Sequence, residues 1–401
     1  MLNISLVILG YLKYSLKVKE LTEWKVKEKE TISFLVKEFE QRKAAELYSR
    51  INVAKTGVID TNKLHSYKYN DDIFRRLATT PKGKNHGFVM FLDWSGSMSW
   101  NLRETLKQLF SLTLFCKQIG VPFEVYAFKD TGGSNPFSYN GKQNVIRGYN
   151  LTLRNFLSSR MNVEEFNFAM SVLWAASDWN ISSHSDRLGG TPLNDAIMIA
   201  PKVVQDFTAR NKLEITNVIW LTDGGSDSAC GTENDTTNRY DRKNHKYFYV
   251  DPTTNKTYDW YPNDWYHTRD NTNTLLRILK DRTGCNLVGF FLFDYESFNR
   301  VDREFNVSGG NPDAYNTARK QWSDNKYYPV RSAGYDEYYI INTKALADTT
   351  NKLAIDNTGE KKMTTKKMVS AFTKFAQKKT VNRVLLRQFV ERIAAQSKKV
   401  A

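Results

Sequence analysis

The fold is indicated by the stretch Gly87-Phe-Val-Met-Phe-Leu-Asp-Trp-Ser-Gly-Ser97. Its first part, 87–92, is a continuous apolar run of strand length, which is typical of a strand buried on both faces. Short oxygen-bearing side chains follow this run. Residues 102–118 then carry apolar side chains at helical spacing. The stretch therefore predicts a buried strand, a polar loop and a helix, which is the repeating unit of a parallel α/β sheet.

The alternation of strand and helix continues along the chain. We expect further strands at 121–128, 217–221, 286–293 and 338–341, and helices at 163–178, 193–204 and 272–282. Buried strands separated by helices imply a mostly parallel sheet that helices cover on both faces. The predicted fold class is α/β: a doubly wound, Rossmann-like domain over residues 87–345, with helical N- and C-terminal extensions.

Segments outside the expected sheet differ in composition. Residues 1–50 are expected to be a helical extension, because apolar residues recur there every three or four positions among Lys and Glu. Residues 51–86 contain Gly, Pro, Asn and Asp and are expected to be a linker. Within the domain, residues 226–271 resemble an insertion. Residues 346–401 are expected to form a basic helical extension.

Composition and charge narrow the class of protein. The chain has 401 residues, 41% of them apolar, and a net charge of +15, so a disordered or collagen-like chain is excluded. Residues 1–86 contribute +7 and residues 351–401 contribute +10, whereas the middle balances at −2. Basic flanks could contact nucleic acid or an acidic protein, although solvated faces of amphipathic helices are the simpler explanation. We expect no membrane contact, because no apolar window reaches about 18 residues. Three widely spaced cysteines favour a reducing compartment, so we expect a cytoplasmic protein.

Three polar segments each follow an expected strand or precede an expected helix. They are Asp93-x-Ser95-x-Ser97, Gly189-Gly-Thr191-Pro-Leu193 and Thr222-Asp223-Gly224. Loops at the carboxyl ends of the strands of an open α/β sheet meet in one crevice. We therefore expect two carboxylates and three hydroxyls to converge. Taken singly, Asp93 and Asp223 could instead be helix N-caps.

Oxygen donors of this kind suit a hard divalent cation. Mg²⁺ prefers six oxygen ligands and retains several waters, and Mn²⁺ is a plausible substitute. The three segments contain neither His nor Cys, which makes zinc, copper and iron poor candidates. Neutral hydroxyl ligands leave the positive charge of the ion incompletely compensated. Such a site would attract the acidic side chain of another protein.

Together the three segments resemble the metal-ion-dependent adhesion site of von Willebrand factor A domains. The resemblance implies that Ser95, Ser97 and Thr191 bind Mg²⁺ directly. It also implies that Asp93 and Asp223 act mainly through bound water. The function implied is non-catalytic binding of a protein partner through one of its acidic residues.

A second resemblance narrows the family. The segments Lys55-Thr-Gly-Val-Ile-Asp60-Thr-Asn-Lys-Leu64 and Phe74-Arg75-Arg76 are similar to the aerobic cobaltochelatase T subunit, and more so to T-subunit-like proteins of T4-type tailed bacteriophages. The resemblance implies an AAA+ ATPase as partner. Trp94 stands where the chelatase subunit usually has Asn, no long acidic segment precedes the domain, and the insertion is additional. These departures put cobalt insertion in doubt.

The insertion carries many aromatic residues. Residues 246–250 and 257–261 predict two strands joined by a turn. One interpretation is a partner-binding surface, because aromatics are enriched in interface cores. Its candidate residues, together with one beside the metal loops, are Trp94, Tyr249, Trp260 and Trp265. The alternative is a hairpin that buries its aromatics against its own domain.

Three functions follow from these patterns. The first is a Mg²⁺-dependent adaptor that partners an AAA+ ATPase to remodel or load a target. The alternatives are a subunit of a cobalt or magnesium chelatase acting on a tetrapyrrole, and a phage protein that binds nucleic acid through its basic flanks. The sequence contains no G-x-x-x-x-G-K-[ST] loop and no H-E-x-x-H helix. We therefore expect no enzyme activity from this chain alone.

Overall fold

The computed structural model describes most of the central domain and parts of its extensions. The described residues are 2–49, 52–59, 74–79, 85–130, 146–147, 151–178, 187–226, 231–232, 247–261, 268–293, 298–325, 327–330 and 334–342. The expected basic C-terminal extension, 346–401, lies outside the described residues.

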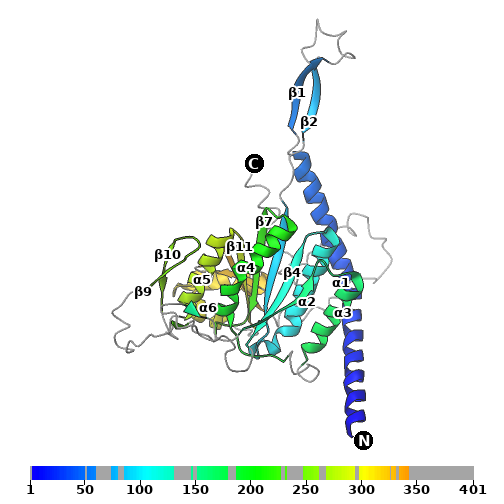
Figure 1. The fold of residues 1–401 in the computed structure, drawn as a ribbon, viewed down its shortest axis with the longest axis vertical. Coiled ribbons are helices and arrows are strands. Elements are labelled where there is room, and N and C mark those ends of the chain that lie inside the picture. Colours follow the sequence, from blue (N-terminus) through cyan, green and yellow to red (C-terminus); the bar gives the residue numbers. More distant parts are fainter. Residues whose placement is uncertain are drawn as a thin grey trace.

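A seven-stranded sheet forms the centre of the domain (Figure 1). Its strands, in spatial order, are β12 (Tyr327–Val330), β13 (Glu337–Asn342), β11 (Asn286–Phe293), β7 (Ile215–Thr222), β3 (His86–Asp93), β4 (Phe123–Lys129) and β6 (Thr152–Ser158). The five inner strands pair in parallel, and the two edge strands pair antiparallel to their neighbours. This order confirms the predicted doubly wound, mostly parallel α/β fold.

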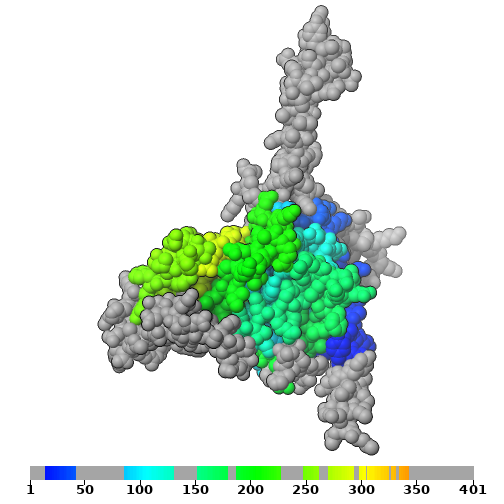
Figure 2. Space-filling view, viewed as in Figure 1, coloured from blue at the N-terminus to red at the C-terminus, as the bar shows by residue number. Residues whose placement is uncertain are grey.

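Helices cover both faces of the sheet. They are α1 (Leu2–Ser49), α2 (Leu102–Ile119), α3 (Val163–Ala176), α4 (Leu193–Asn211), α5 (Thr268–Thr283), α6 (Phe298–Phe305) and α7 (Pro312–Asn325). Figure 2 shows α4, in green, and α5, in yellow-green, side by side across the face that it presents. Local sequence explains where several helices begin and end. A capping box of Asn162 and Glu165 starts α3, and Gly120, with a φ of 71°, ends α2 in the left-handed conformation.

The alternation of side chains along β3 explains why both faces are covered. Phe88, Met90 and Leu92 lie in a core cluster with α1, α2 and α3. Val89 and Phe91 point to the other face and pack in a cluster with α4 and α5. Because residues 87–92 of this strand are all buried, they form a continuous apolar run in the sequence.

The N-terminal helix packs along the flank of the domain. Buried residues of α1 recur at helical spacing from Leu21 to Phe39, and the indole of Trp24 stacks on that of Trp174 at 6.2 Å between centroids. An ion pair of 2.8 Å joins Glu20 to Arg103 on α2. The helix runs from Leu2 to Ser49, within the residues 1–50 for which the sequence predicts a helical extension.

Several sequence expectations need correction. The segment 51–86, expected to be a linker, contains an antiparallel hairpin of β1 (Asn52–Ile59) and β2 (Phe74–Thr79). The strands β6 and β12 and the helices α6 and α7 were not expected. Two small pairs complete the described strands: β5 (Ile146–Arg147) with β8 (Gly231–Thr232), and β9 (Tyr247–Val250) with β10 (Thr257–Trp260). The hairpin predicted within the insertion is therefore confirmed.

None of the described helices has the length and apolar character that crossing a membrane requires.

Candidate metal centre

Three loops meet at the carboxyl end of β3. Asp93 is the last residue of this strand, and Asp223 directly follows β7, which is its neighbour in the sheet. Thr191 lies two residues before α4. We call residues 93–97 the first loop, 188–192 the second loop and 222–226 the third loop. Parallel strands end on the same edge of a sheet, so this convergence is the one that the sequence predicts.

Hydrogen bonds join the first loop to the third. The Ser97 hydroxyl donates to Asp223 Oδ1 at 2.9 Å, and Ser95 Oγ and Ser97 Oγ lie 3.0 Å apart. Thr222 Oγ1, which the sequence analysis did not assign a role, donates to Asp93 Oδ2 at 2.7 Å. Neighbouring oxygens in an octahedral Mg²⁺ shell with ligands at 2.0–2.1 Å lie about 3 Å apart. The two seryl oxygens thus have a separation that suits one shell.

Backbone hydrogen bonds join the first loop to the second. Gly96 N donates to Gly189 O at 2.8 Å, and Gly189 N donates to Trp94 O at 3.1 Å. Gly189 lies tightly against Asp130, because a Cβ built at residue 189 would lie 2.2 Å from Asp130 Oδ1. A side chain at this position would therefore have to displace the carboxylate of Asp130, which directly follows β4.

Ser226 joins the second loop to the third. Its hydroxyl accepts a hydrogen bond from Asn194 N at 3.1 Å and donates one to Thr191 O at 3.5 Å. Asn194 Oδ1 in turn accepts a 2.6 Å hydrogen bond from Thr272 on α5. Sequence reasoning missed these three residues, since they position the loops through backbone and helix contacts that no motif encodes.

Exposure increases across the centre. Asp93 and Ser95 are buried, with 0% and 1% of their surface exposed, and Thr191 is 6% exposed. Asp223 is half-buried and Ser97 is exposed. The donors therefore run from a buried carboxylate to a hydroxyl at the surface, which leaves one side of the centre open to another molecule.

The donor set fits Mg²⁺ or Mn²⁺ and not zinc. Hard divalent cations take oxygen ligands, and the residues that meet here offer hydroxyls and carboxylates. Among the described residues, no group of three or more His, Cys, Asp or Glu side chains could hold a metal ion. The part of Ser95, Ser97, Thr191, Asp93 and Asp223 in metal binding stays a prediction.

The aromatic residues proposed for partner binding lie mainly inside the protein. Trp94 is 1% exposed and packs against Phe156, with ring centroids 5.5 Å apart. Trp260 is 4% exposed, and Tyr249 is half-buried with its ring 6.1 Å from the indole. These three rings pack in the core clusters, and Trp94 and Trp260 offer almost no surface to a partner. Trp265 lies outside the described residues.

Polar contacts clamp the β9–β10 hairpin onto α5. Asp251, at 0% exposed, accepts hydrogen bonds from Arg282 Nε at 3.1 Å and from Thr254 Oγ1 at 2.7 Å. Hydrogen bonding from the guanidinium lowers the pKa of Asp251 to about 2. Side chains alternate along β9, so that Phe248 and Val250, each 58% exposed, point outward while the tyrosines point inward. The outer face of the hairpin thus differs from the aromatic set that the sequence suggested.

Comparison with known proteins finds only distant structural likeness. No family model and no curated protein matches the chain. It is similar to the pilus adhesin SpaC from Lactobacillus rhamnosus GG in its open conformation, at 13% identity and a TM-score of 0.36, over 78% of this chain and 30% of the adhesin. It is also similar to the vWF domain of the type V pili tip protein Mfa5 from Porphyromonas gingivalis, at 11% identity and a TM-score of 0.28, over 75% of this chain and 97% of that domain. The chain thus spans less than a third of the SpaC adhesin. At such TM-scores the fold assignment rests on the strand order of the chain itself.

Proposed function

We propose that this chain is a metal-dependent protein-binding module that uses a divalent cation to hold an acidic side chain of its partner. The observation that supports the proposal best is the hydrogen-bonded series Ser95–Ser97–Asp223, which links two loops and includes the exposed hydroxyl of Ser97. At the same end of the sheet, hydrogen bonds join the second loop, which carries Thr191, to the first and third loops.

Each residue of the centre has a distinct part in the proposal. Ser95, Ser97 and Thr191 would hold Mg²⁺ through neutral hydroxyls, and Asp93 and Asp223 would hold bound waters. The cation would supply a positive charge that its own hydroxyl ligands leave largely uncompensated, and so attract a carboxylate. Buried Asp93 is kept in place by Thr222, which fixes the orientation of its carboxylate.

The resemblance to the cobaltochelatase T subunit adds an AAA+ ATPase in the cytoplasm as the proposed partner. The test is a pull-down from the native cell with and without EDTA. Chelation should release the partner. Retention of the same ATPase in EDTA would contradict a role for the ion in holding it.

The metal centre itself is tested by Asp93→Asn and Ser97→Ala. Asparagine keeps an oxygen that can accept the Thr222 hydrogen bond, and Ser97 is exposed, so both variants should fold. We expect Mg²⁺ affinity, measured by calorimetry, to fall about 10- to 100-fold in each. Asp206→Asn on α4 is the charge-matched control, since its carboxylate is exposed and pairs with Lys202 at 2.8 Å. Mg²⁺ affinity equal to that of the parent in both centre variants would refute the assignment.

A further inference from the structure

An unusually exposed tryptophan lies beside the candidate metal centre. Trp100 is 85% exposed, whereas the other described tryptophans are buried or half-buried. Tryptophan is highly buried on average, because exposure of its large apolar ring to water is unfavourable. An indole in this position is therefore available to another molecule.

The backbone that carries Trp100 is firmly anchored. The 3₁₀ turn η2 (Ser97–Trp100) begins at the exposed seryl residue of the centre. Met98 within the turn and Leu102 just after it are both fully buried. Backbone hydrogen bonds from Asn101 N to Met98 O, at 2.9 Å, and from Ser99 N to Gly96 O, at 3.2 Å, close the turn. The positions of Ser97 and Trp100 are thus fixed relative to one another.

The spacing within this turn defines what could contact both residues. A 3₁₀ helix rises about 2.0 Å per residue, so the backbone advances about 6 Å from Ser97 to Trp100. An extended peptide advances about 3.3 Å per residue, and its side chains at i and i+2 point to the same side, about 6.6 Å apart. The two spacings match.

We infer that the partner segment is an extended peptide in which an Asp or Glu and a large apolar residue stand two positions apart. The carboxylate goes to the cation beside Ser97, and the apolar side chain packs on the Trp100 indole. This inference rests on the proposed function, and it adds the residue that selects among acidic segments. An acidic residue alone balances the charge of the ion, whereas the contact of the apolar residue with Trp100 distinguishes one acidic segment from another.

Synthetic peptides test the inference directly. The probes are Gly-Ser-Asp-Ser-Phe-Ser-Gly, the same peptide with Phe replaced by Ser, the same peptide with Asp replaced by Ser, and Gly-Ser-Asp-Phe-Ser-Ser-Gly, in which the two groups are adjacent. Acetylated and amidated ends remove stray charges. Affinities of the full chain for each immobilised peptide are measured by surface plasmon resonance in Mg²⁺ and in EDTA.

We expect the parent in Mg²⁺ to bind the first peptide about tenfold more tightly than the one without Phe, a factor that corresponds to about 1.4 kcal/mol. Trp100→Ala should bind these two peptides equally, with unchanged Mg²⁺ affinity by calorimetry. Trp100→Phe, which keeps an aromatic ring, should retain most of the preference. Because Trp100 is exposed, neither substitution should unfold the protein.

The measurements distinguish a failure of the inference about Trp100 from a failure of the proposed function. If Trp100→Ala keeps the tenfold preference, or if the adjacent-residue peptide binds the parent as tightly as the first, the inference about Trp100 is wrong while the metal centre stands. If Mg²⁺ makes no difference to any peptide that carries Asp, the proposed function itself is wrong, and the inference that rests on it is lost as well.

Discussion

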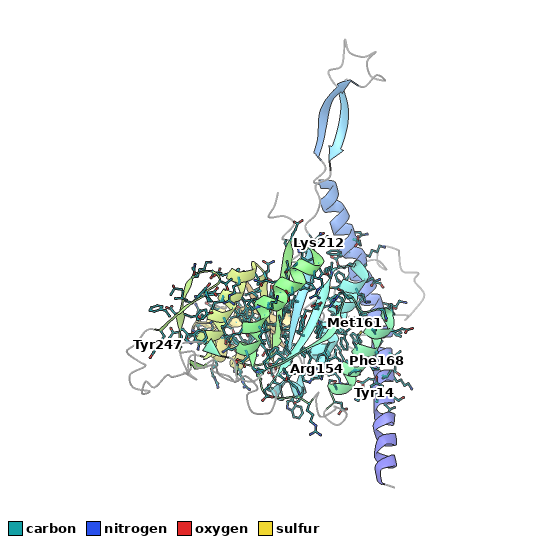
Figure 3. All side chains as sticks on the ribbon, viewed as in Figure 1. Tyr14, Arg154, Met161, Phe168, Lys212 and Tyr247 are labelled. Atoms are coloured by element: carbon teal, nitrogen blue, oxygen red, sulfur yellow. The ribbon has the colours of Figure 1, made fainter. Side chains whose placement is uncertain are left out.

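The three loops of the candidate centre and the β9–β10 hairpin differ in where they direct their distinctive side chains. In the loops, polar groups from three separate parts of the chain gather, and the series from Asp93 to Ser97 ends at the surface. In the hairpin, the Tyr rings of β9 and the Trp260 indole turn inward, and Trp260 is 4% exposed, whereas Phe248 points outward. Figure 3 shows the two sides of the molecule, with Tyr247 on the hairpin at one side and Phe168 of α3 at the other.

This difference follows from what each kind of side chain requires. A buried carboxylate needs hydrogen-bond donors or a cation, so polar residues in converging loops are informative about chemistry. Burial of an aromatic side chain lowers the free energy of the folded protein. Such residues therefore pack against a neighbouring apolar surface, which here is that of α5. A cluster of Tyr and Trp in a sequence therefore indicates burial as readily as partner binding, and among the described tryptophans it is Trp100, outside this cluster, that is exposed.

The strongest test of the comparison is Trp260→Ala. Because the indole is buried among Tyr249 and α5 residues, its removal should lower the free energy of unfolding by about 3–5 kcal/mol. The matched variant on the outer face, Phe248→Ser, should change it by no more than about 0.5 kcal/mol. Urea unfolding followed by circular dichroism measures both. Equal losses would show that the two faces of the hairpin are not different in the way described.

The clamp on the hairpin gives the next largest effect. Asp251→Asn should lower the free energy of unfolding by about 1.5–3 kcal/mol at pH 7, because it removes a charged acceptor from Arg282. Since the pKa of Asp251 is lowered to about 2 in the folded protein, this stabilisation is complete above about pH 5 and is lost as the pH falls towards 2.

The difference between parent and Asp251→Asn should therefore shrink when chemical denaturation is repeated at pH 3 and below. Asp206→Asn, at an exposed carboxylate, serves as the control for general acid effects. A difference that stays constant from pH 7 to pH 2 would contradict the ion-pair explanation.

The smallest effect concerns the joint between the second and third loops. Ser226→Ala removes the hydroxyl that bonds both Asn194 N and Thr191 O, so it should cost about 1 kcal/mol of stability. It should also weaken Mg²⁺ binding several-fold, because Thr191 is then held less firmly relative to Asp223. Calorimetry checks the second effect, with Ser171→Ala on α3 as the control. Unchanged Mg²⁺ affinity would mean that the loops do not depend on this contact.

The sequence was most informative where one element is buried on both faces. The strands β3, β7 and β11 each contain a continuous apolar run, at 87–92, 218–221 and 287–293, because each has neighbours on both sides and helices above and below. The edge strand β6 was missed, since Arg154 and Asn155 are exposed and interrupt its apolar pattern. The β1–β2 hairpin was missed for a related reason: Lys55 stands opposite Arg76 in its register, so no apolar alternation marks it.

The sequence predicted that the loops carrying the oxygen donors meet, while the part of these donors in metal binding stays a prediction. Asp93, Ser95, Ser97 and Asp223 are recognisable from their order along the chain, because parallel strands bring their ends together. Ser226 could not be recognised, since it acts through hydrogen bonds to the backbone of the second loop and of α4. The exposure of Trp100 and the burial of Trp94 also depend on tertiary packing that a local pattern does not contain.

Helix α1 also sets a length scale for whatever the domain is joined to. Its 48 residues, at about 1.5 Å each, make a rod about 72 Å long. Within residues 14–41, whose side chains the structure describes, the buried positions run from Leu21 to Phe39 and span about 27 Å. Figure 1 shows this rod extending past the sheet at both ends, with the β1–β2 hairpin beyond one of them. A molecule bound to that hairpin would therefore lie at the opposite end of a stiff helix from the first residues of α1. The domain would lie along the side of the helix, between these two ends.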